Sequence, residues 1–190
     1  MSDLPAIGAI ILAGGKSSRM GRDKAFIRLA NGKMIIQSII DAILPVTPHL
    51  QIIANSPAYH QFGFTVYEDL VKEKGPMGGL LTGLQRSEHE YNLVLGCDMP
   101  FITTELLQYL VARTSKKDLA VVASRGGRTE PLCGIYHKKC CALLTEMLGR
   151  DQLSLQQALQ RLPATLLEIS HEPFYSDSLL LNVNTPEELE

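Results

Sequence analysis

A short apolar run that leads into two adjacent glycines constrains this 190-residue chain more than any other feature. Residues 7–12 predict a buried strand, and Gly14 and Gly15 follow shortly after it. The loop behind them carries four cations within nine residues, namely Lys16, Arg19, Arg22 and Lys24. Glycines let a backbone approach a ligand closely, successive N–H groups bind anions, and Arg and Lys supply charge for a polyphosphate. This combination predicts a nucleotide site at the carboxyl end of a parallel sheet.

The two commonest phosphate motifs do not fit this loop. A P-loop reads G-x-x-x-x-G-K-[ST], but Ile10 stands where its first glycine belongs. The Rossmann fingerprint G-x-G-x-x-G fails as well, because Gly14 and Gly15 are adjacent. The alternative is an ordinary strand-to-helix turn with solvated lysines. The clustering of cations on one short loop favours the nucleotide.

Composition limits the remaining classes of function. Hydrophobic residues make up 45% of the chain and charged residues 20%, which is typical of one soluble globular domain over residues 1–190. The net charge of −2 gives no chain-wide attraction to nucleic acid. No apolar run approaches the ~18 residues of a membrane span, and no signal peptide is evident. Four cysteines and five histidines show no zinc-binding spacing. We therefore expect a cytoplasmic protein without nucleic-acid or membrane partners.

Strand and helix signals alternate along the chain, which predicts a three-layer α/β domain with a mostly parallel sheet. Hairpin-like pairing around residues 119–136 predicts one antiparallel intrusion. The expected strands cover residues 7–12, 50–55, 64–67, 91–97, 119–124, 131–136, 165–169 and 179–183. The expected helices cover residues 34–44, 78–86, 139–148 and 154–162, with another capped by Thr103 or Thr104 and a last one opening at Pro186.

A second glycine cluster spans residues 75–80 and includes Gly78. It leads into a helix, and glycines before a helix N-terminus suit an anion or the close approach of a flat base. Considered alone, the segment could equally be a tight turn with a packing glycine. Lys72 and Lys74 just before it favour a ligand slightly.

Asp98 directly follows an apolar strand, so we expect its carboxylate at the same sheet edge as the first loop. Mg²⁺ prefers one or two protein carboxylates together with phosphate oxygens and water, so one aspartate there fits a metal shared with a nucleotide. The alternative is that Asp98 caps the next helix. Pro100 argues against capping, because it moves the preferred caps to Thr103 and Thr104.

Four polar side chains are further candidates because each stands at a predicted strand end. Asn182 and Asn184 lie two residues apart and therefore point the same way, toward a ligand or a metal-bound water. Asn55 and Asp69 follow the second and third predicted strands, where either could also be a turn former. Thr185 and Pro186 by themselves are explained as a helix start.

These segments, in this order, resemble the molybdenum cofactor guanylyltransferases. The resemblance rests on residues 12–15 and 19–24 (Leu-Ala-Gly-Gly and Arg-Met-Gly-Arg-Asp-Lys), 75–80 (Gly-Pro-Met-Gly-Gly-Leu), 97–100 (Cys-Asp-Met-Pro) and 182–186 (Asn-Val-Asn-Thr-Pro), and it covers nearly the whole chain. The first motif is shared by many sugar and polyol nucleotidyltransferases. All four together, in a chain this short, are much more specific.

The resemblance implies a Rossmann-like fold and the transfer of GMP from GTP to molybdopterin, with Mg²⁺ as cofactor. It places Leu12, Ala13, Gly14, Gly15, Lys24, Asn55, Asp69 and Gly78 at the nucleotide, Asp98 at Mg²⁺ and GTP together, and Asn182 and Asn184 toward the pterin. It also implies molybdenum-insertion and molybdoenzyme maturation proteins as partners. We expect Arg19 and Lys24 to hold the β- and γ-phosphates and, with Asp98, to be catalytic.

Two other functions remain open at this point. A cytidylyltransferase for the same cofactor is the nearest, although its relatives carry Ala-Ala-Gly where this chain has Leu-Ala-Gly-Gly at residues 12–15. A catalytically silent nucleotide-binding regulator is the other, but it would be expected to lose Lys24 or Asp98.

Overall fold

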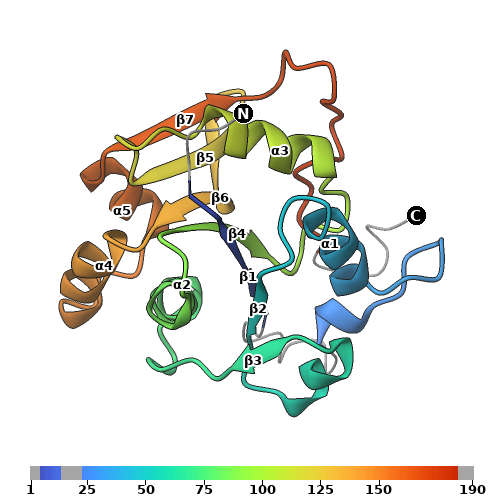
Figure 1. The fold of residues 1–190 in the computed structure, drawn as a ribbon, viewed down its shortest axis with the longest axis horizontal. Coiled ribbons are helices and arrows are strands. Elements are labelled where there is room, and N and C mark those ends of the chain that lie inside the picture. The colour runs from blue at the N-terminus through green and yellow to red at the C-terminus, as the bar shows by residue number, and fades with distance from the viewer. Residues whose placement is uncertain (1–4, 14–22, 184–190) are drawn as a thin grey trace.

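The computed structural model describes residues 5–13 and 23–183. Within these residues, seven strands form one sheet in the order β3-β2-β1-β4-β6-β5-β7 (Figure 1). The strands are β1 (Gly8–Leu12), β2 (Leu50–Ile53), β3 (Thr65–Tyr67), β4 (Tyr91–Gly96), β5 (Ala120–Arg125), β6 (Arg128–His137) and β7 (Ala164–Glu168).

The sheet is mostly parallel. Strand β1 pairs in parallel with β2 and β4, β2 with β3, and β5 with β7. Strand β6 is antiparallel to both of its neighbours, β4 and β5. The prediction of one antiparallel intrusion around residues 119–136 is therefore confirmed. The central strand β4 is buried at every position, which explains why its residues are apolar except for Asn92 and do not alternate with polar ones.

Helices cover both faces of the sheet, so the three-layer prediction is confirmed (Figure 1). Helices α1 and α3 pack in one hydrophobic cluster, and α2, α4 and α5 pack in a second one on the other face. The helices are α1 (Ile35–Ile43), α2 (Gly75–Arg86), α3 (Thr104–Arg113), α4 (Cys140–Gly149) and α5 (Leu155–Arg161), with short 3₁₀ helices η2 (Lys24–Phe26) and η3 (Pro57–Phe62). Among the described residues, no helix combines the length and hydropathy needed to cross a membrane.

Local sequence explains where two of these helices begin. Helix α3 begins after Thr103, whose hydroxyl accepts a hydrogen bond from the N–H of Leu106 at 3.4 Å, as predicted. Helix α2 begins at Gly75 rather than at Gly78. Its second residue is Pro76, and proline is favoured in a first helical turn because its missing N–H has no partner there.

The predicted strand over residues 179–183 is wrong. The N–H groups of Leu179 and Leu181 donate to the carbonyls of Ser176 and Ser178 at 3.0 and 2.9 Å, so this backbone closes turns instead of a sheet ladder. The apolar run reflects burial alone, since the side chains of Leu179, Leu180 and Val183 are buried in the core. The helix predicted to open at Pro186 lies outside the described residues.

Candidate active site

An open pocket lies at the carboxyl edge of the sheet, where the chain leaves β1 and β4. The strand order reverses at this place, because β1 leads to β2 and β3 on one side while β4 lies on the other. Such a switch point leaves a crevice for a ligand. The pocket is lined by Leu12, Ala13, Asp23, Lys24, Ile53, Ala54, Asn55, Asp69, Gly75, Pro76, Gly79, Gly96, Cys97, Asp98 and Leu132.

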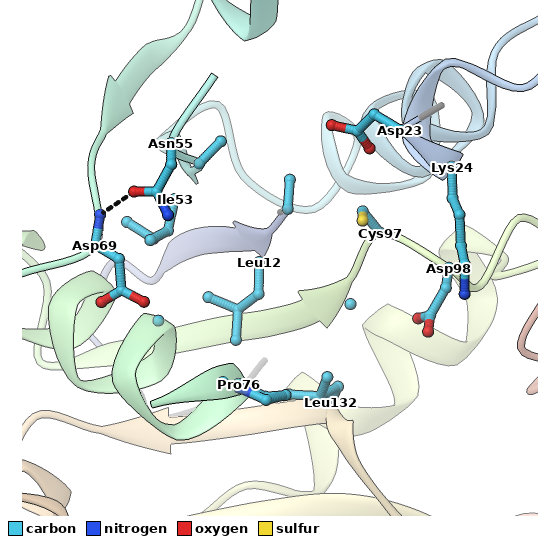
Figure 2. Close-up of a pocket in the computed structure, with 15 residues that line it drawn as sticks. Leu12, Asp23, Lys24, Ile53, Asn55, Asp69, Pro76, Cys97, Asp98 and Leu132 are labelled. Carbon is cyan, nitrogen blue, oxygen red and sulfur yellow. Dashed lines mark hydrogen bonds between the residues drawn. The ribbon is translucent and has the colours of Figure 1, made fainter. Parts of the chain in front are cut away.

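Polar groups stand at the two ends of this pocket, and apolar side chains lie between them. Figure 2 shows Asn55 and Asp69 at one end, Lys24 beside Asp98 at the other, and Leu12 between the two pairs. An elongated ligand with a polar group at each end fits this arrangement. Residues from the first, second and third sequence motifs therefore meet in one pocket.

The Asp98 carboxylate is held in a tight place at the end of β4. A Cβ added to Gly96 would lie 2.8 Å from its Oδ1 atom and 3.3 Å from a methyl carbon of Leu132, so the glycine leaves room for the carboxylate. Burial raises the pKa of Asp98, while its own backbone N–H and the Lys24 ammonium act in the opposite direction. Asp98 does not cap α3, since Thr103 does.

A second carboxylate, Glu130, lies near Asp98. Leu95 pairs with Cys133 in the antiparallel β4–β6 ladder, so Glu130 lies further along β6 on the side where β4 ends and the chain turns to Asp98. Burial raises the pKa of Glu130, and the Asp98 charge raises it further, whereas a hydrogen bond from the Asn182 amide lowers it. Glu130 thus connects the third motif to the fourth.

The fourth motif is also tied to the third by backbone. The N–H of Val183 donates to the Asp98 carbonyl at 2.8 Å. This bond fixes the chain beside the end of β4 and brings Asn182 to the same edge of the sheet as Asp98.

Asn55 and Asp69 form a connected unit at the other end of the pocket. The Asn55 side-chain oxygen accepts from the N–H of Asp69 at 3.1 Å (Figure 2). Oδ1 of Asp69 accepts from the N–H of Val71 at 3.2 Å and from the Thr82 hydroxyl at 2.9 Å. Asp69 therefore forms a local turn, Asn55 links the end of β2 to the loop after β3, and both line the pocket as well.

Gly78 lies beside this unit without lining the pocket itself. A Cβ at Gly78 would stand 2.8 Å from the Val71 carbonyl oxygen and 3.2 Å from Oδ2 of Asp69. The glycine is therefore needed for the close approach of α2 to residues 69–71. Of the other predicted site residues, Gly14, Gly15, Arg19 and Asn184 lie outside the described residues.

The cysteines differ in their surroundings. All four are free, and Cys133 and Cys140 are buried. Burial raises the pKa of the Cys140 thiol to about 12, which agrees with a structural role. Cys97 instead lies in the pocket wall next to Asp98 (Figure 2).

Asp23 and Glu130 are the residues that sequence reasoning missed. Asp23 lines the pocket directly before Lys24, and its place inside the first motif was an available signal. Glu130 is brought near Asp98 by the packing of β6 beside β4, which no local sequence pattern encodes. Within residues 5–13 and 23–183 there is no group of three or more His, Cys, Asp or Glu side chains that could hold a metal ion. A metal in this pocket would therefore also need oxygen atoms from a bound substrate or water.

The chain is similar to known proteins over almost its whole length. Residues 9–166 match the family model of the MobA-like NTP transferase domain. A probable molybdenum cofactor guanylyltransferase of Flavobacterium johnsoniae is 37% identical over 186 residues, which cover 98% of this chain and 96% of the relative. A molybdenum cofactor guanylyltransferase of Vibrio parahaemolyticus is 35% identical over 184 residues, with 95% and 91% of the two chains covered.

Solved structures share the fold. A molybdopterin-guanine dinucleotide biosynthesis protein A of Archaeoglobus fulgidus superposes with a TM-score of 0.79 at 22% identity, covering 96% of this chain and 94% of that one. A 4-diphosphocytidyl-2C-methyl-D-erythritol synthase of Anaerococcus prevotii superposes at 0.74 and 14% identity, covering 97% and 92%. The fold alone thus does not select the base. The sequence relatives do select the family: the chain belongs to the molybdenum cofactor guanylyltransferases, which carry the MobA-like NTP transferase domain.

Proposed function

We propose that this chain transfers GMP from GTP to molybdopterin, giving the guanine dinucleotide cofactor and pyrophosphate. The observation that carries the proposal is the pocket itself, where Lys24 and Asp98 stand at one end and Asn55 and Asp69 at the other. A nucleoside triphosphate has a base at one end and phosphates at the other, so it matches this distribution of polar groups.

The reaction needs few catalytic groups from the protein. The terminal phosphate oxygen of molybdopterin attacks the α-phosphorus of GTP, and the bond to the β-phosphate oxygen breaks as pyrophosphate leaves in line. Because the nucleophile is already an anion, no general base is required. The barrier comes from repulsion between like charges and from charge that gathers on the leaving group. Lys24, together with Arg19 from the same motif, would donate to the β- and γ-phosphates and stabilise the departing pyrophosphate.

The residues at the phosphate end fit a magnesium ion. Asp98, with the Glu130 carboxylate of β6 nearby, would provide the hard oxygen donor that Mg²⁺ prefers, with the remaining positions left to phosphates and water. In this proposal Asp98 is the protein ligand of the metal. Mg²⁺ bound there would neutralise charge on the phosphates during the transfer. Asn182 and Asn184 would lie toward the pterin.

Base choice is proposed to depend on acceptors at the other end. Guanine presents N1–H and N2–H donors, so it needs acceptors such as the Asp69 carboxylate and backbone carbonyls near Leu12. Cytosine presents acceptors at O2 and N3, which such a site would leave unpaired, at ~1–3 kcal/mol per buried group. A cytidylyltransferase for the same cofactor therefore remains the second candidate function. The preference for GTP or CTP distinguishes the two candidates.

The proposal also includes a location, a domain extent and partner proteins. We place the activity in the cytoplasm, in a single nucleotidyltransferase domain over residues 1–190. Molybdenum-insertion and molybdoenzyme maturation proteins are the proposed partners, since the product must be passed on to other proteins.

Pyrophosphate release distinguishes an enzyme from a silent regulator. The purified chain is incubated with Mg²⁺ and GTP, with and without molybdopterin, and pyrophosphate is measured with a coupled assay. We expect release that requires both substrates and Mg²⁺. Nucleotide binding without any release of pyrophosphate would contradict the transferase assignment.

A further inference from the structure

A buried aromatic cluster lies behind the turn that carries Lys24. Tyr59, from η3, is completely buried. Its ring packs against Phe26, the last residue of η2, with the ring centroids 5.0 Å apart, and Phe26 in turn stacks on Phe62 at 5.9 Å. Helix η2 begins with Lys24, so the cluster fixes the far side of the turn that presents this lysine.

One hydrogen bond connects this cluster to the pocket. The Tyr59 hydroxyl donates to Oδ2 of Asp23 at 2.7 Å. The other oxygen of that carboxylate, Oδ1, accepts from the N–H of Ala25 at 3.2 Å and so caps η2. One carboxylate oxygen of Asp23 thus accepts a hydrogen bond from the backbone of the turn, and the other accepts one from a residue 36 positions away in the sequence. Through this carboxylate, Tyr59 restrains the turn in a way that apolar packing alone does not.

The surroundings keep the hydroxyl protonated. Burial raises the pKa of Tyr59 above its ordinary value, and Cys97 and Asp23 raise it further. The phenol therefore remains a donor to Asp23.

We infer that Tyr59 is a positioning residue for the transfer reaction: through Asp23 it holds the turn that directs Lys24 toward the phosphates. This inference rests on the proposed function, because it assigns Lys24 to the β- and γ-phosphates. Figure 2 shows Asp23 at the pocket and the Lys24 side chain extended beside Asp98. Catalytic positioning is sensitive to displacements of about 1 Å, so loss of one restraint on the turn is expected to reduce turnover.

The test removes the hydroxyl and keeps the ring. Tyr59→Phe retains the packing with Phe26, and we expect kcat to fall roughly tenfold. Tyr109→Phe is the matched control, because its hydroxyl also donates to a carboxylate, Oε1 of Glu172, at 2.7 Å and lies outside the pocket lining. The control is expected to keep the kcat of the unchanged protein, whatever its effect on the melting temperature.

Two further measurements separate positioning from a general structural effect. In a double-mutant cycle, Tyr59→Phe is expected to reduce kcat less than about twofold when Lys24 is already alanine, since the restraint then has nothing to position. In calorimetry, Tyr59→Phe is expected to weaken GTP but leave GMP, which lacks the β- and γ-phosphates, within about twofold of its original affinity.

Three results would overturn the inference: unchanged kcat in Tyr59→Phe, an equal loss in the Lys24→Ala background, or equal weakening of GTP and GMP. Failure of the proposed function looks different, because the unchanged protein would then transfer no GMP to molybdopterin. In that case the comparison of GTP with GMP still tests whether Tyr59 acts on phosphate binding.

Discussion

Burial and a neighbouring positive charge have opposite effects on the pKa of Asp98. Burial raises the pKa of its carboxyl group, the Lys24 ammonium lowers that pKa, and the Glu130 carboxylate lies nearby on β6. A pKa above the unfolded value means that ionisation at neutral pH costs the folded protein stability instead of supplying it. In our proposal a cation bound beside Asp98 would remove that cost, so metal binding there would also stabilise the fold.

Replacing this carboxylate is expected to separate stability from activity. Asp98→Asn should leave the fold intact, with a melting temperature in metal-free buffer equal to or above that of the unchanged protein, because a costly buried charge is gone. GMP transfer should collapse, since an amide cannot neutralise a divalent cation. Thermal melts with and without Mg²⁺ and a turnover assay check both parts. Near-normal Mg²⁺-dependent turnover would remove Asp98 from the metal site.

The cations of the first motif are tested one at a time. Lys24→Ala and Arg19→Ala should each lower kcat/KM for GTP by ~10²-fold or more, the scale of losing one donor that stabilises transition-state charge. Steady-state kinetics with saturating molybdopterin measure this. Lys33→Ala is a suitable control, because Lys33 pairs with Asp41 at 2.6 Å on an exposed surface away from the pocket lining. Normal kinetics in both variants would contradict the assignment of this loop to the phosphates.

Among the elements, α2 and the loop after β3 depend on one close contact. The missing side chain of Gly78 lets α2 lie against the Val71 carbonyl and Asp69. We expect Gly78→Ala to raise KM for GTP, because an added methyl displaces the loop that holds Asp69, while kcat changes little. Gly149→Ala is the matched control, since its Cβ would meet nothing within 4 Å. Equal KM values for the two variants would show that this contact does not shape the nucleotide site.

A second element-level contact ties β7 to the turn between β5 and β6. The Glu168 carboxylate accepts from the Ser170 hydroxyl and from the N–H groups of Gly126 and Gly127, which lower its pKa to about 2. Both glycines have positive φ angles of 56° and 77°, a conformation that favours glycine. The carboxylate thus fixes a turn that a side-chain-bearing residue would strain.

This contact predicts a pH dependence of stability with a definite sign. Because the folded pKa of Glu168 lies below the unfolded one of ~4.3, the charged carboxylate stabilises the protein above that pH, and the effect is lost as the pH falls toward 2. Glu168→Gln should therefore melt below the unchanged protein at pH 7, with a smaller difference at pH 3. Melts of both proteins, with the exposed Glu88→Gln as control, measure it. A difference that grows with acid would contradict the argument.

At the scale of elements the sequence predicts well where burial and periodicity agree. The apolar stripe of α1, including Ile36 and Ile40, and the largely apolar run of β4 led to the correct elements. The apolar run at 179–183 led to a wrong strand prediction, because apolar residues that are buried in the core can form turns as readily as strands. Partners such as Asp23 with Tyr59, or Asp98 with Glu130, are set by tertiary register, which local patterns do not encode.

For the whole molecule, the strand order explains why the motifs meet. The first motif leaves β1 and the third leaves β4, two parallel neighbours whose carboxyl ends share an edge at the switch point. The second motif enters from α2 on one face, and the fourth is fixed by the bond from Val183 to Asp98. Solved structures of this fold include both a molybdopterin-guanine dinucleotide biosynthesis protein and a 4-diphosphocytidyl-2C-methyl-D-erythritol synthase. The fold alone therefore does not select the base, and our proposal assigns that choice to the groups at the Asn55–Asp69 end of the pocket.

Direct competition between two nucleotides tests the central claim. The protein is supplied with Mg²⁺, molybdopterin and equal concentrations of GTP and CTP, and the two dinucleotide products are quantified by mass spectrometry during the initial phase. We predict at least tenfold more guanine than cytosine dinucleotide, about the discrimination of one or two unpaired buried polar groups. Equal amounts, or an excess of the cytosine product, would contradict the guanylyltransferase assignment.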